Sequence, residues 1–378
     1  MERVTLSSIN QYVSATVNPA DTPEDIFELY SVPSYENQYP EIVKGKEIGS
    51  AKAVVQEGDV LICKINPKIN RVWVVKHNTE YPLLASSEWI VVRNSAINSN
   101  YLKWYFMSPF FRKLLTSQVA GIGGSLTRAQ PKQVAKYPVP IVELEKQGKI
   151  VNLLEKVNFV ISARQQQLAK LDELVKARFV DIIHNDKNWE KYHFSDITSS
   201  RLGKMLDAKQ QTGKHPFPYL ANANVQWFRF ETDNLNRMDF NETEQVEFSL
   251  KDGDLLVCEG GEIGRCAVWH DQVQPCYFQK ALHRVRCNQE TIVPDYLAWW
   301  FKFNCENNGF AAIEGAKATI AHLPGAKLKQ LLVVVPSIEL QYRFVDFIEQ
   351  TDMVKVSVQK SLEQLETLKK ALMQKYFG

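Results

Sequence analysis

Hydrophobic side chains recur at coiled-coil spacing in two separate stretches of the chain. Alternating steps of four and three residues from Ile150 meet apolar side chains at eight of ten positions, and the same steps from Phe344 meet seven of ten. Such seams predict two long amphipathic helices, the first of them roughly 60 Å long at about 1.5 Å per residue. A helix of that length cannot bury its apolar stripe against its own domain, so we expect the two helices to pack against each other.

Polar side chains interrupt both seams. Two arginines break the first seam, and a threonine and two lysines break the second. Such residues either set the register of a helix pair or mark where another protein docks. The docking candidates are Arg164, Arg178, Lys355 and Lys369. A plain dimerisation zipper is the alternative, but two seams in one chain can satisfy each other without a second copy.

The chain before each helix alternates between apolar and polar residues in short runs, which predicts strand-rich globular domains. Residues 53–63 are typical of a strand, a turn and a second strand, with Gly58 and Asp59 at the turn. A proline ends the last run before each helix, as is common at a strand terminus. Other strands are expected at residues 71–75, 89–93, 137–140, 265–269, 281–286 and 333–336, and short amphipathic helices at residues 101–115 and 296–304.

Four local motifs occur twice, in the same order and about 195 residues apart. Gly-Asp-x-Leu-x-Cys begins at Gly58 and at Gly253, and Tyr-Leu-x-Trp begins at Tyr101 and at Tyr296. A proline, Glu-Leu and a glutamine open each long helix, and Leu-x-x-Leu-x-x-Leu follows within it. An offset that drifts so little indicates two copies of a whole domain rather than a solenoid repeat. We therefore expect an α+β chain with globular domains at residues 1–140 and 186–335 and spacer helices at residues 141–185 and 336–378.

With these motifs laid out, the chain resembles the specificity (S) subunits of type I restriction–modification systems over almost its whole length. No single motif is specific, but all four in order and twice are strong. The resemblance implies two target-recognition domains that each read one half of a split double-stranded DNA sequence. It implies an antiparallel helix pair that holds the domains apart as a pseudo-two-fold repeat. It also implies that two methyltransferase (M) subunits dock around the helices and that restriction (R) subunits join through them. Because the two domains differ in sequence, the target should be asymmetric.

Composition excludes some classes of protein. The 45 Lys and Arg residues against 43 Asp and Glu leave a net charge of +2, so DNA binding must come from local basic loops. No apolar run approaches the roughly 20 residues of a membrane span, and the start lacks a signal-peptide core, so a cytoplasmic location is expected. Six scattered cysteines without a Cys-x-x-Cys pair argue against a disulfide framework. No metal or cofactor is expected, with a site of Cys266, His270 and Cys276 as a minor alternative.

The second domain has the clearer DNA-contact candidates. Residues 259–265 place three glycines after a predicted strand, where backbone can approach a phosphate and Arg265 can add a forked donor. A plain glycine turn is the alternative. Residues 219–227 place three amides on one strand face, either for adenine readout or for capping turns. The candidates in these segments are Asn222, Asn224, Gln226, Gly260, Gly261 and Arg265.

A basic run follows in the same domain. Residues 279–286 alternate, so that Lys280, Arg284 and Arg286 share one face of a predicted strand and some of them are expected to meet phosphates. His283 lies on the apolar face and is expected to be structural.

The first domain carries a basic loop where the second has its glycines. Residues 64–71 contain three cations and two asparagines. A second basic turn lies near residue 45, and similar loops before each long helix could bind phosphate through Ser125 or Thr319. The candidates in these segments are Lys44, Lys46, Lys64, Asn66, Lys68, Arg71, Arg128 and Lys317.

A stand-alone DNA methyltransferase and a protein-only scaffold are the two rival classes of protein. A stand-alone DNA methyltransferase would need a glycine-rich cofactor loop and an Asn/Asp-Pro-Pro-aromatic motif that holds the flipped base, and the sequence has neither. No constellation of residues for catalysis is recognisable, so we expect a non-enzymatic recognition subunit. A coiled-coil scaffold that binds only protein is the remaining alternative.

Overall fold

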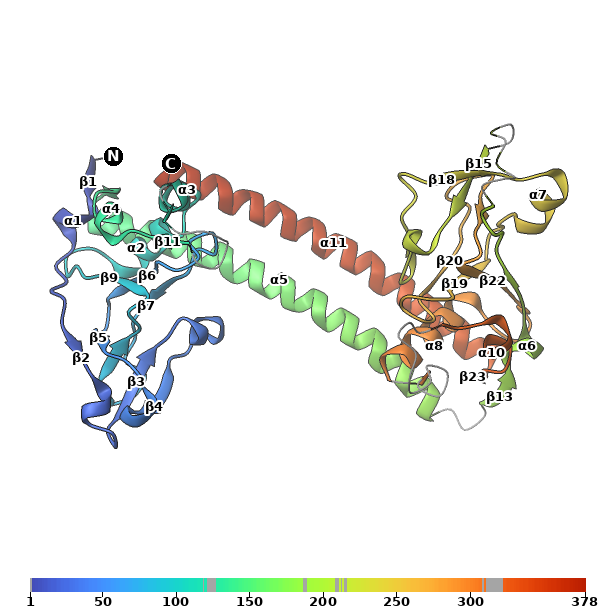
Figure 1. Cartoon of the computed structure of the whole chain (residues 1–378), viewed down its shortest axis with the longest axis horizontal. Coiled ribbons are helices and arrows are strands. Elements are labelled where there is room, and N and C mark those ends of the chain that lie inside the picture. The colour runs from blue at the N-terminus through green and yellow to red at the C-terminus, as the bar shows by residue number, and fades with distance from the viewer. Residues whose placement is uncertain are drawn as a thin grey trace. The chain divides into compact units, whose positions relative to one another are not determined.

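The structure is a computed structural model that describes residues 2–117, 119–120, 127–185, 189–207, 211, 213, 216–307, 309–310 and 322–378 (Figure 1). Helices and strands occur along the whole chain, which confirms the α+β class. The chain divides into two compact units, each of which combines a globular part with one portion of each long helix. Unit 1 comprises residues 1–166 and 359–378, and unit 2 comprises residues 167–358.

Unit 1 is built from short strands. They are β1 Glu2–Thr5, β2 Thr16–Val17, β3 Ile26–Tyr30, β4 Glu41–Lys44, β5 Lys52–Val54, β6 Val60–Cys63, β7 Val72–Val74, β8 Leu83–Ala85, β9 Trp89–Val92, β10 Val119–Ala120, β11 Arg128–Ala129 and β12 Pro138–Ile141. Among the described residues, they form a sheet of order β2-β5-β8-β3-β4 and an antiparallel sheet of order β7-β6-β9. Strands β3 and β8 are parallel. The pairs β1-β12 and β10-β11 are antiparallel.

Unit 2 repeats this mixture of sheets. Its strands are β13 Glu190–His193, β14 Thr198–Leu202, β15 Pro216–Leu220, β16 Val225–Gln226, β17 Arg229–Phe230, β18 Asn236–Asp239, β19 Leu255–Cys258, β20 Cys266–Val268, β21 Tyr277–Phe278, β22 Leu282–Cys287 and β23 Leu332–Val335. An antiparallel sheet has the order β14-β22-β19-β20, and a second sheet has the order β18-β15-β21 with β15 and β21 parallel. The pair β13-β23 in unit 2 matches β1-β12 in unit 1.

The two predicted long helices are present as α5 Leu144–Asn185, with 42 residues, and α11 Ile338–Phe377, with 40 residues. The helix predicted at residues 101–115 is instead two helices, because Pro109 cannot continue a helix and starts a new one. The other helices are α1 Leu6–Ile9, α2 Ser99–Phe106, α3 Pro109–Ser117, α4 Pro131–Val134, α6 Phe194–Ile197, α7 Glu242–Phe248, α8 Pro294–Glu306 and α10 Gly325–Lys329, with 3-10 turns η1 Pro19–Asp21, η2 Pro33–Asn37, η3 Gly45–Glu47 and η5 Asn222–Asn224.

Each Gly-Asp-x-Leu-x-Cys motif forms a turn closed by a buried aspartate. The carboxylate of Asp59 accepts two hydrogen bonds of 2.7 Å from the Arg93 guanidinium and one of 2.9 Å from a backbone N–H three residues earlier. Asp254 repeats this with Arg286 at 2.7 and 3.1 Å and with the equivalent N–H at 2.9 Å. The glycine before each aspartate has a φ of 87° or 82°, where a side chain would be strained. The motif therefore links a turn to a neighbouring strand through one charged group.

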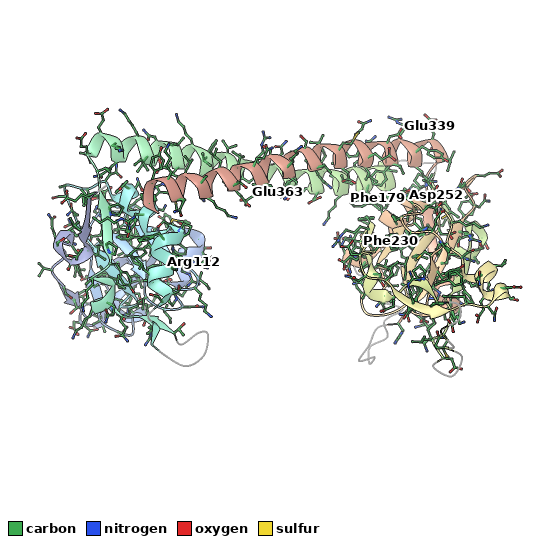
Figure 2. The ribbon with its side chains drawn as sticks, turned by 90° about the horizontal axis from the view of Figure 1, so that it is seen from above. Arg112, Phe179, Phe230, Asp252, Glu339 and Glu363 are labelled. Carbon is green, nitrogen blue, oxygen red and sulfur yellow. The ribbon has the colours of Figure 1, made fainter. Side chains whose placement is uncertain are left out.

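The Tyr-Leu-x-Trp helices, α2 and α8, lie in the core of their units. Each motif tyrosine donates its hydroxyl proton to a backbone carbonyl of the closing strand, at 3.0 Å for Tyr101 and 2.9 Å for Tyr296. The end of a long helix packs on the same ring, with centroids 5.5 Å apart both for Tyr101 with Phe377 and for Tyr296 with Phe179. Figure 2 labels Phe179 where α5 meets the globular part of unit 2. Each globular core thus includes the last turns of a long helix.

A buried glutamine opens each long helix. The Gln147 Oε1 accepts from the Asn98 N–H at 2.9 Å, and the Gln341 Oε1 accepts from the Val293 N–H at 2.8 Å. Each glutamine also donates its amide to the carbonyl five residues before it, at 2.7 and 2.9 Å. This side chain therefore joins the start of a long helix to the loop that enters α2 or α8.

We expect the Asp254→Ala variant to lower the free energy of unfolding by about 2 to 3 kcal/mol. Removing the carboxylate leaves a charge and a turn N–H without their acceptor, and the loss stays at the low end of the buried-pair range because the Arg286 side chain is 36% exposed. Urea unfolding followed by circular dichroism measures the change. The matched control is Asp252→Ala, which removes only a surface contact with His270 and should change stability by less than about 1 kcal/mol. Equal losses in the two variants would contradict a structural role for the motif.

Candidate nucleic-acid interface

The predicted basic loop of unit 1 is fixed against β11. The Asn66 N–H donates to the Thr127 carbonyl at 2.9 Å, and the Lys64 carbonyl accepts an N–H of β11 at 2.8 Å. Asn66 has a φ of 45°, a left-handed conformation that asparagine tolerates better than most residues. Its main role in the structure is therefore to shape the turn that carries the neighbouring lysines.

Four cations gather at this loop and are called the unit 1 basic cluster: Lys64, Lys68, Arg112 and Arg128. Arg112 of α3 donates to the Lys68 carbonyl, and it is labelled in Figure 2. The Arg128 side chain is 55% exposed and lies 3.1 Å from Glu88. The sequence did not single out Arg112, because one arginine on an amphipathic helix is typical of a solvated face. Hydrogen bonds and a β-bridge thus bring the four cations together around one loop.

Like Arg128, the other predicted cations that bound this loop or the turn near residue 45 are paired with carboxylates. Arg71 is largely buried and lies 3.4 Å from Glu36. Lys44 and Lys46 both contact Glu24, at 2.8 and 3.0 Å. The hydrogen bond with Glu24 raises the pKa of Lys44, and the two lysines lower the pKa of Glu24. The positive charge of these cations is therefore partly neutralised by Glu24 and Glu36 in the structure without DNA.

A glycine loop occupies the matching place in unit 2, as predicted. Gly261 and Gly264 have φ values of 78° and 77°, which favour glycine. The Asn222 Nδ2 donates to the Gly260 carbonyl at 3.1 Å, and Arg265 donates to the Asn222 carbonyl at 3.1 Å. The Arg265 side chain is only 17% exposed. Arg265 thus supports the loop from within, whereas the sequence suggested an outward forked donor.

The predicted strand face of three amides is wrong. Residues 222–224 form η5, which interrupts the strand between β15 and β16. The Asn224 Oδ1 accepts from the N–H that opens this turn, and its Nδ2 donates to the Glu231 carbonyl, both at 2.9 Å. Gln226 donates to the Ala223 carbonyl at 3.0 Å. The asparagines cap and brace turns, which is the alternative that the sequence left open.

The predicted basic face of β22 is covered. Arg284 is 8% exposed, and its guanidinium donates to the Glu247 and Ser249 carbonyls at 3.0 and 2.8 Å. Burial lowers its pKa. Arg286 shares this face and pairs with Asp254, but its side chain is 36% exposed, so only Arg284 is buried away from a phosphate. Lys280 precedes β22 rather than lying in it, and it stays exposed.

The loop is closed in the same way in both units. Ile65 bridges to Arg128 in unit 1, and Gly260 bridges to His322 in unit 2. His322 was not predicted, because nothing in the sequence indicates this pairing. Lys317, predicted beside Arg128, lies outside the described residues, as do Ser125 and Thr319. The two bridges therefore place Arg128 beside the basic loop of unit 1 and His322 beside the glycine loop of unit 2.

His283 holds this part of unit 2 together. Its Nε2 donates to the Leu323 carbonyl at 2.9 Å, and the Leu323 N–H donates to the Glu259 carbonyl at 2.6 Å. Burial lowers the pKa of His283. The structural role expected of this histidine is therefore confirmed, and it anchors residues 322–323 beside the glycine loop.

The lysines that interrupt the second helical seam join the two long helices. In unit 2, Lys355 lies 2.8 Å from Asp172 of α5. In unit 1, Lys369 donates to Asn158 of α5 at 2.6 Å, and burial lowers its pKa. Arg178 instead pairs along its own helix with Asp181 at 2.8 Å, and Arg164 is half-buried. The two lysine contacts agree with a role in setting register, the first of the two readings of these residues.

Within the described residues, no group of three or more His, Cys, Asp or Glu side chains could hold a metal ion. Burial raises the pKa of Cys258 to about 11 and of Cys276 to about 12, and Cys63 is buried as expected. His270 contacts Asp252 at 3.0 Å. Across the same residues, none of the helices has the length and apolarity needed to cross a bilayer.

A duplicated α+β unit, with a bridged loop in each copy and a portion of both long helices, defines the class: a tandem-repeat α+β protein. Comparison with known proteins agrees. A putative type I restriction enzyme specificity subunit of Methanocaldococcus jannaschii is 23% identical over 195 residues, which is 50% of this chain and 46% of that protein. A putative type I specificity subunit of Haemophilus influenzae is 24% identical over 291 residues, 72% of this chain and 69% of that protein. The first match therefore spans less than half of the relative's length.

Solved structures agree on the fold. A chain from a study of complex assembly and conformational transition in a type I restriction–modification system superposes with a TM-score of 0.68 at 16% identity, covering 100% of this chain and 97% of the other. The HsdS subunit of Thermoanaerobacter tengcongensis gives 0.52 at 16% identity, covering 100% and 96%. The S subunit of M. genitalium gives 0.53 at 11% identity, with the same coverage. No family model matches the chain. The chain is a relative of the type I specificity subunits in sequence and has their fold.

We expect unit 2 to lose stability as pH falls below about 6.5, the ordinary pKa of histidine. The folded state holds His283 neutral with a lowered pKa, so the unfolded chain binds more protons between the folded and ordinary values, and stability rises with pH across that window. Urea unfolding at pH 7.5 and 5.5 measures the difference. The His283→Gln variant should be less stable at pH 7.5, and its stability should fall less on acidification than that of the wild type. An unchanged pH dependence in the variant would contradict the assignment.

Proposed function

We propose that this chain is the DNA-recognition subunit of a type I restriction–modification complex. In this function, the two globular domains, at residues 1–140 and 186–335, each read one half of an asymmetric, split double-stranded DNA target. The helices at residues 141–185 and 336–378 hold the two readers apart. Such a subunit would act in the cytoplasm, where its DNA lies.

The duplication is the observation that carries the proposal. The buried Asp–Arg pair, the glutamine that opens a long helix and the tyrosine against a helix end occur in both units with matching distances. A frame built twice in one chain suits two similar tasks on one extended ligand. The relatives named as type I specificity subunits support DNA as that ligand.

The proposed DNA contacts differ between the domains. In unit 1, the exposed cations of the unit 1 basic cluster are suited to phosphates, since they lie around one braced loop. In unit 2, the glycine loop lets backbone groups approach DNA, with Lys280 as the exposed predicted cation nearby in sequence. Arg265, Arg284 and Asn224 take positioning roles in this proposal, because their polar groups are already bonded.

We propose that catalysis belongs to partner subunits. The chain would direct methyltransferase subunits, two per chain, and restriction subunits that join through them. Within the described residues the structure has no cluster suited to a metal ion, and the sequence has no cofactor loop. The structural neighbour from a type I complex supports this kind of assembly.

We expect the double variant Lys68→Ala/Arg128→Ala to weaken DNA binding by the complex with methyltransferase subunits. Each phosphate contact releases counterions from DNA on binding, and a lost contact removes that release. The slope of log affinity against log salt should therefore become shallower by roughly 2 for two contacts. Fluorescence anisotropy over a salt series measures it. The matched control is Lys44→Ala/Lys46→Ala, which removes the same charge from the same unit but from lysines that share Glu24. A control that weakens binding as much would remove the preference for the basic cluster.

We expect deletion of this chain to abolish one split adenine-methylated motif in the genome. Single-molecule methylome sequencing of cells with and without the chain identifies the motif and gives its two halves and gap. Replacing residues 64–71 with another sequence should change only one half of the motif, because that loop belongs to one domain. If every methylated motif survived deletion, the alternative of a protein-only scaffold would be favoured.

A further inference from the structure

The two units have cavities at corresponding places, where the globular part meets the long helices. In unit 2 this is a groove of about 630 Å³. In unit 1 the corresponding residues are split between cavities of about 240 and 460 Å³. Three lining residues of unit 1, Lys76, Asn100 and Glu155, correspond to three of unit 2, His270, Asp295 and Glu349, at offsets of 194, 195 and 194.

The charge of the lining differs between the units. In the unit 2 groove, five carboxylates line the wall against four lysine and arginine side chains. The two unit 1 cavities have four lysines and two carboxylates. With His270 neutral, the groove lining carries one net negative charge, whereas the lining of the two unit 1 cavities together carries two net positive charges.

An aromatic platform lines the unit 2 groove. Phe228 stacks on Trp299, with ring centroids 4.6 Å apart and planes 19° apart. Phe228 has a φ of 61° in the turn between β16 and β17, a position that favours glycine, and yet its ring is 41% exposed. In unit 1, the tryptophan equivalent to Trp299 is Trp104, which is buried and has the Lys369 ammonium 5.3 Å from its ring centroid. Trp299 and Phe228 thus line a groove in unit 2, whereas the equivalent Trp104 of unit 1 is in contact with the Lys369 ammonium group.

Two carboxylates of the groove have no salt bridge within the described part of the chain. The other acids are paired, with Asp172 and Asp352 on Lys355 and with Glu306 between two lysines. Asp295 and Glu349 are left, and burial raises the pKa of Asp295 although His270 opposes this. Asp252, labelled in Figure 2, takes the contact with His270. An aromatic platform that lines the same groove as two carboxylates without a salt bridge is the chemistry that binds a guanidinium or an ammonium group.

We propose that this groove binds an arginine- or lysine-bearing segment of one methyltransferase subunit, with the cation between the Phe228–Trp299 platform and the carboxylates of Asp295 and Glu349. The inference rests on the proposed function, which supplies that partner. Because the unit 1 cavities have the opposite charge, a second copy of the same partner cannot make this contact there. The two methyltransferase subunits therefore bind with unequal affinity, and the step at unit 2 is the more sensitive to salt.

The test titrates the full chain with its methyltransferase subunit by isothermal titration calorimetry at low and moderate salt. The double variant Asp295→Asn/Glu349→Gln should weaken one binding step by about tenfold or more and reduce its salt dependence, as the loss of close charge pairs does. The other step should not change. Unit 1 has asparagine at the position of Asp295, so this substitution suits the fold. Phe228→Gly, which relieves the positive φ and removes the ring, should weaken the same step.

The matched control is Glu155→Gln, the equivalent of Glu349 in unit 1, which should change neither step by more than about twofold. Urea unfolding verifies that all variants fold. Wild-type binding in both the double variant and Phe228→Gly would overturn the inference, as would an equal loss in the control. Changed self-association of the chain alone, measured by sedimentation velocity, would assign the groove to a second copy and overturn it as well. If the wild-type complex neither bound nor methylated a split target, the proposed function itself would fail; if it did both, a negative groove result would concern the groove alone.

Discussion

The structure depends on one packing constraint: the hydrophobic core of each unit includes the end of a long helix. That helix, α11 for unit 1 and α5 for unit 2, starts among the residues assigned to the other unit. Phe377, from the last turn of α11, packs on Tyr101, and Phe179, near the end of α5, packs on Tyr296. Both phenylalanines are buried, and burying such a ring contributes roughly 1.5 to 3 kcal/mol. Neither core can therefore be complete unless both long helices form. Formation of the long helices and completion of the two hydrophobic cores are therefore coupled.

The elements that repeat in sequence were predicted best. The strands around Gly58 and Gly253, the Tyr-Leu-x-Trp helix of unit 2 and both long helices form where the pattern places them, whereas the Tyr-Leu-x-Trp helix of unit 1 ends before Pro109. Their roles were harder to predict. Asp59 looked like an ordinary turn aspartate, because its partner Arg93 lies 34 residues away in sequence. The pair forms only because β9 lies beside β6 in the sheet, and strand neighbours cannot be deduced from local alternation.

In the candidate site, too, the sequence predicted where residues lie along a strand or loop but not which tertiary contacts they make. Alternation correctly placed Arg284 and Arg286 on one face of β22, but it carries no information about what covers that face. The carbonyls of residues 247–249 and the carboxylate of Asp254 cover it, so the two arginines support the fold. Conversely, Arg112 joins the unit 1 basic cluster from a helix that the sequence did not connect with the loop. Composition located the basic loop, whereas tertiary contacts decided which of its neighbours share its surface.

The features that the two units share are buried, and the features that distinguish them lie at the surface. The shared parts are buried: the Asp–Arg pair, the glutamine at each helix start and the tyrosine under each helix end. The differences are at the surface, where exposed cations of one loop face solvent in unit 1 and glycine backbone does so in unit 2. The difference extends to the cavities beside the long helices, where Lys and Arg outnumber Asp and Glu in unit 1 and Asp and Glu outnumber Lys and Arg by one in unit 2. Because the frame is the same, any difference in what the two units bind must come from these surface residues. A duplicated fold can thus bind two unlike ligands without changing its core.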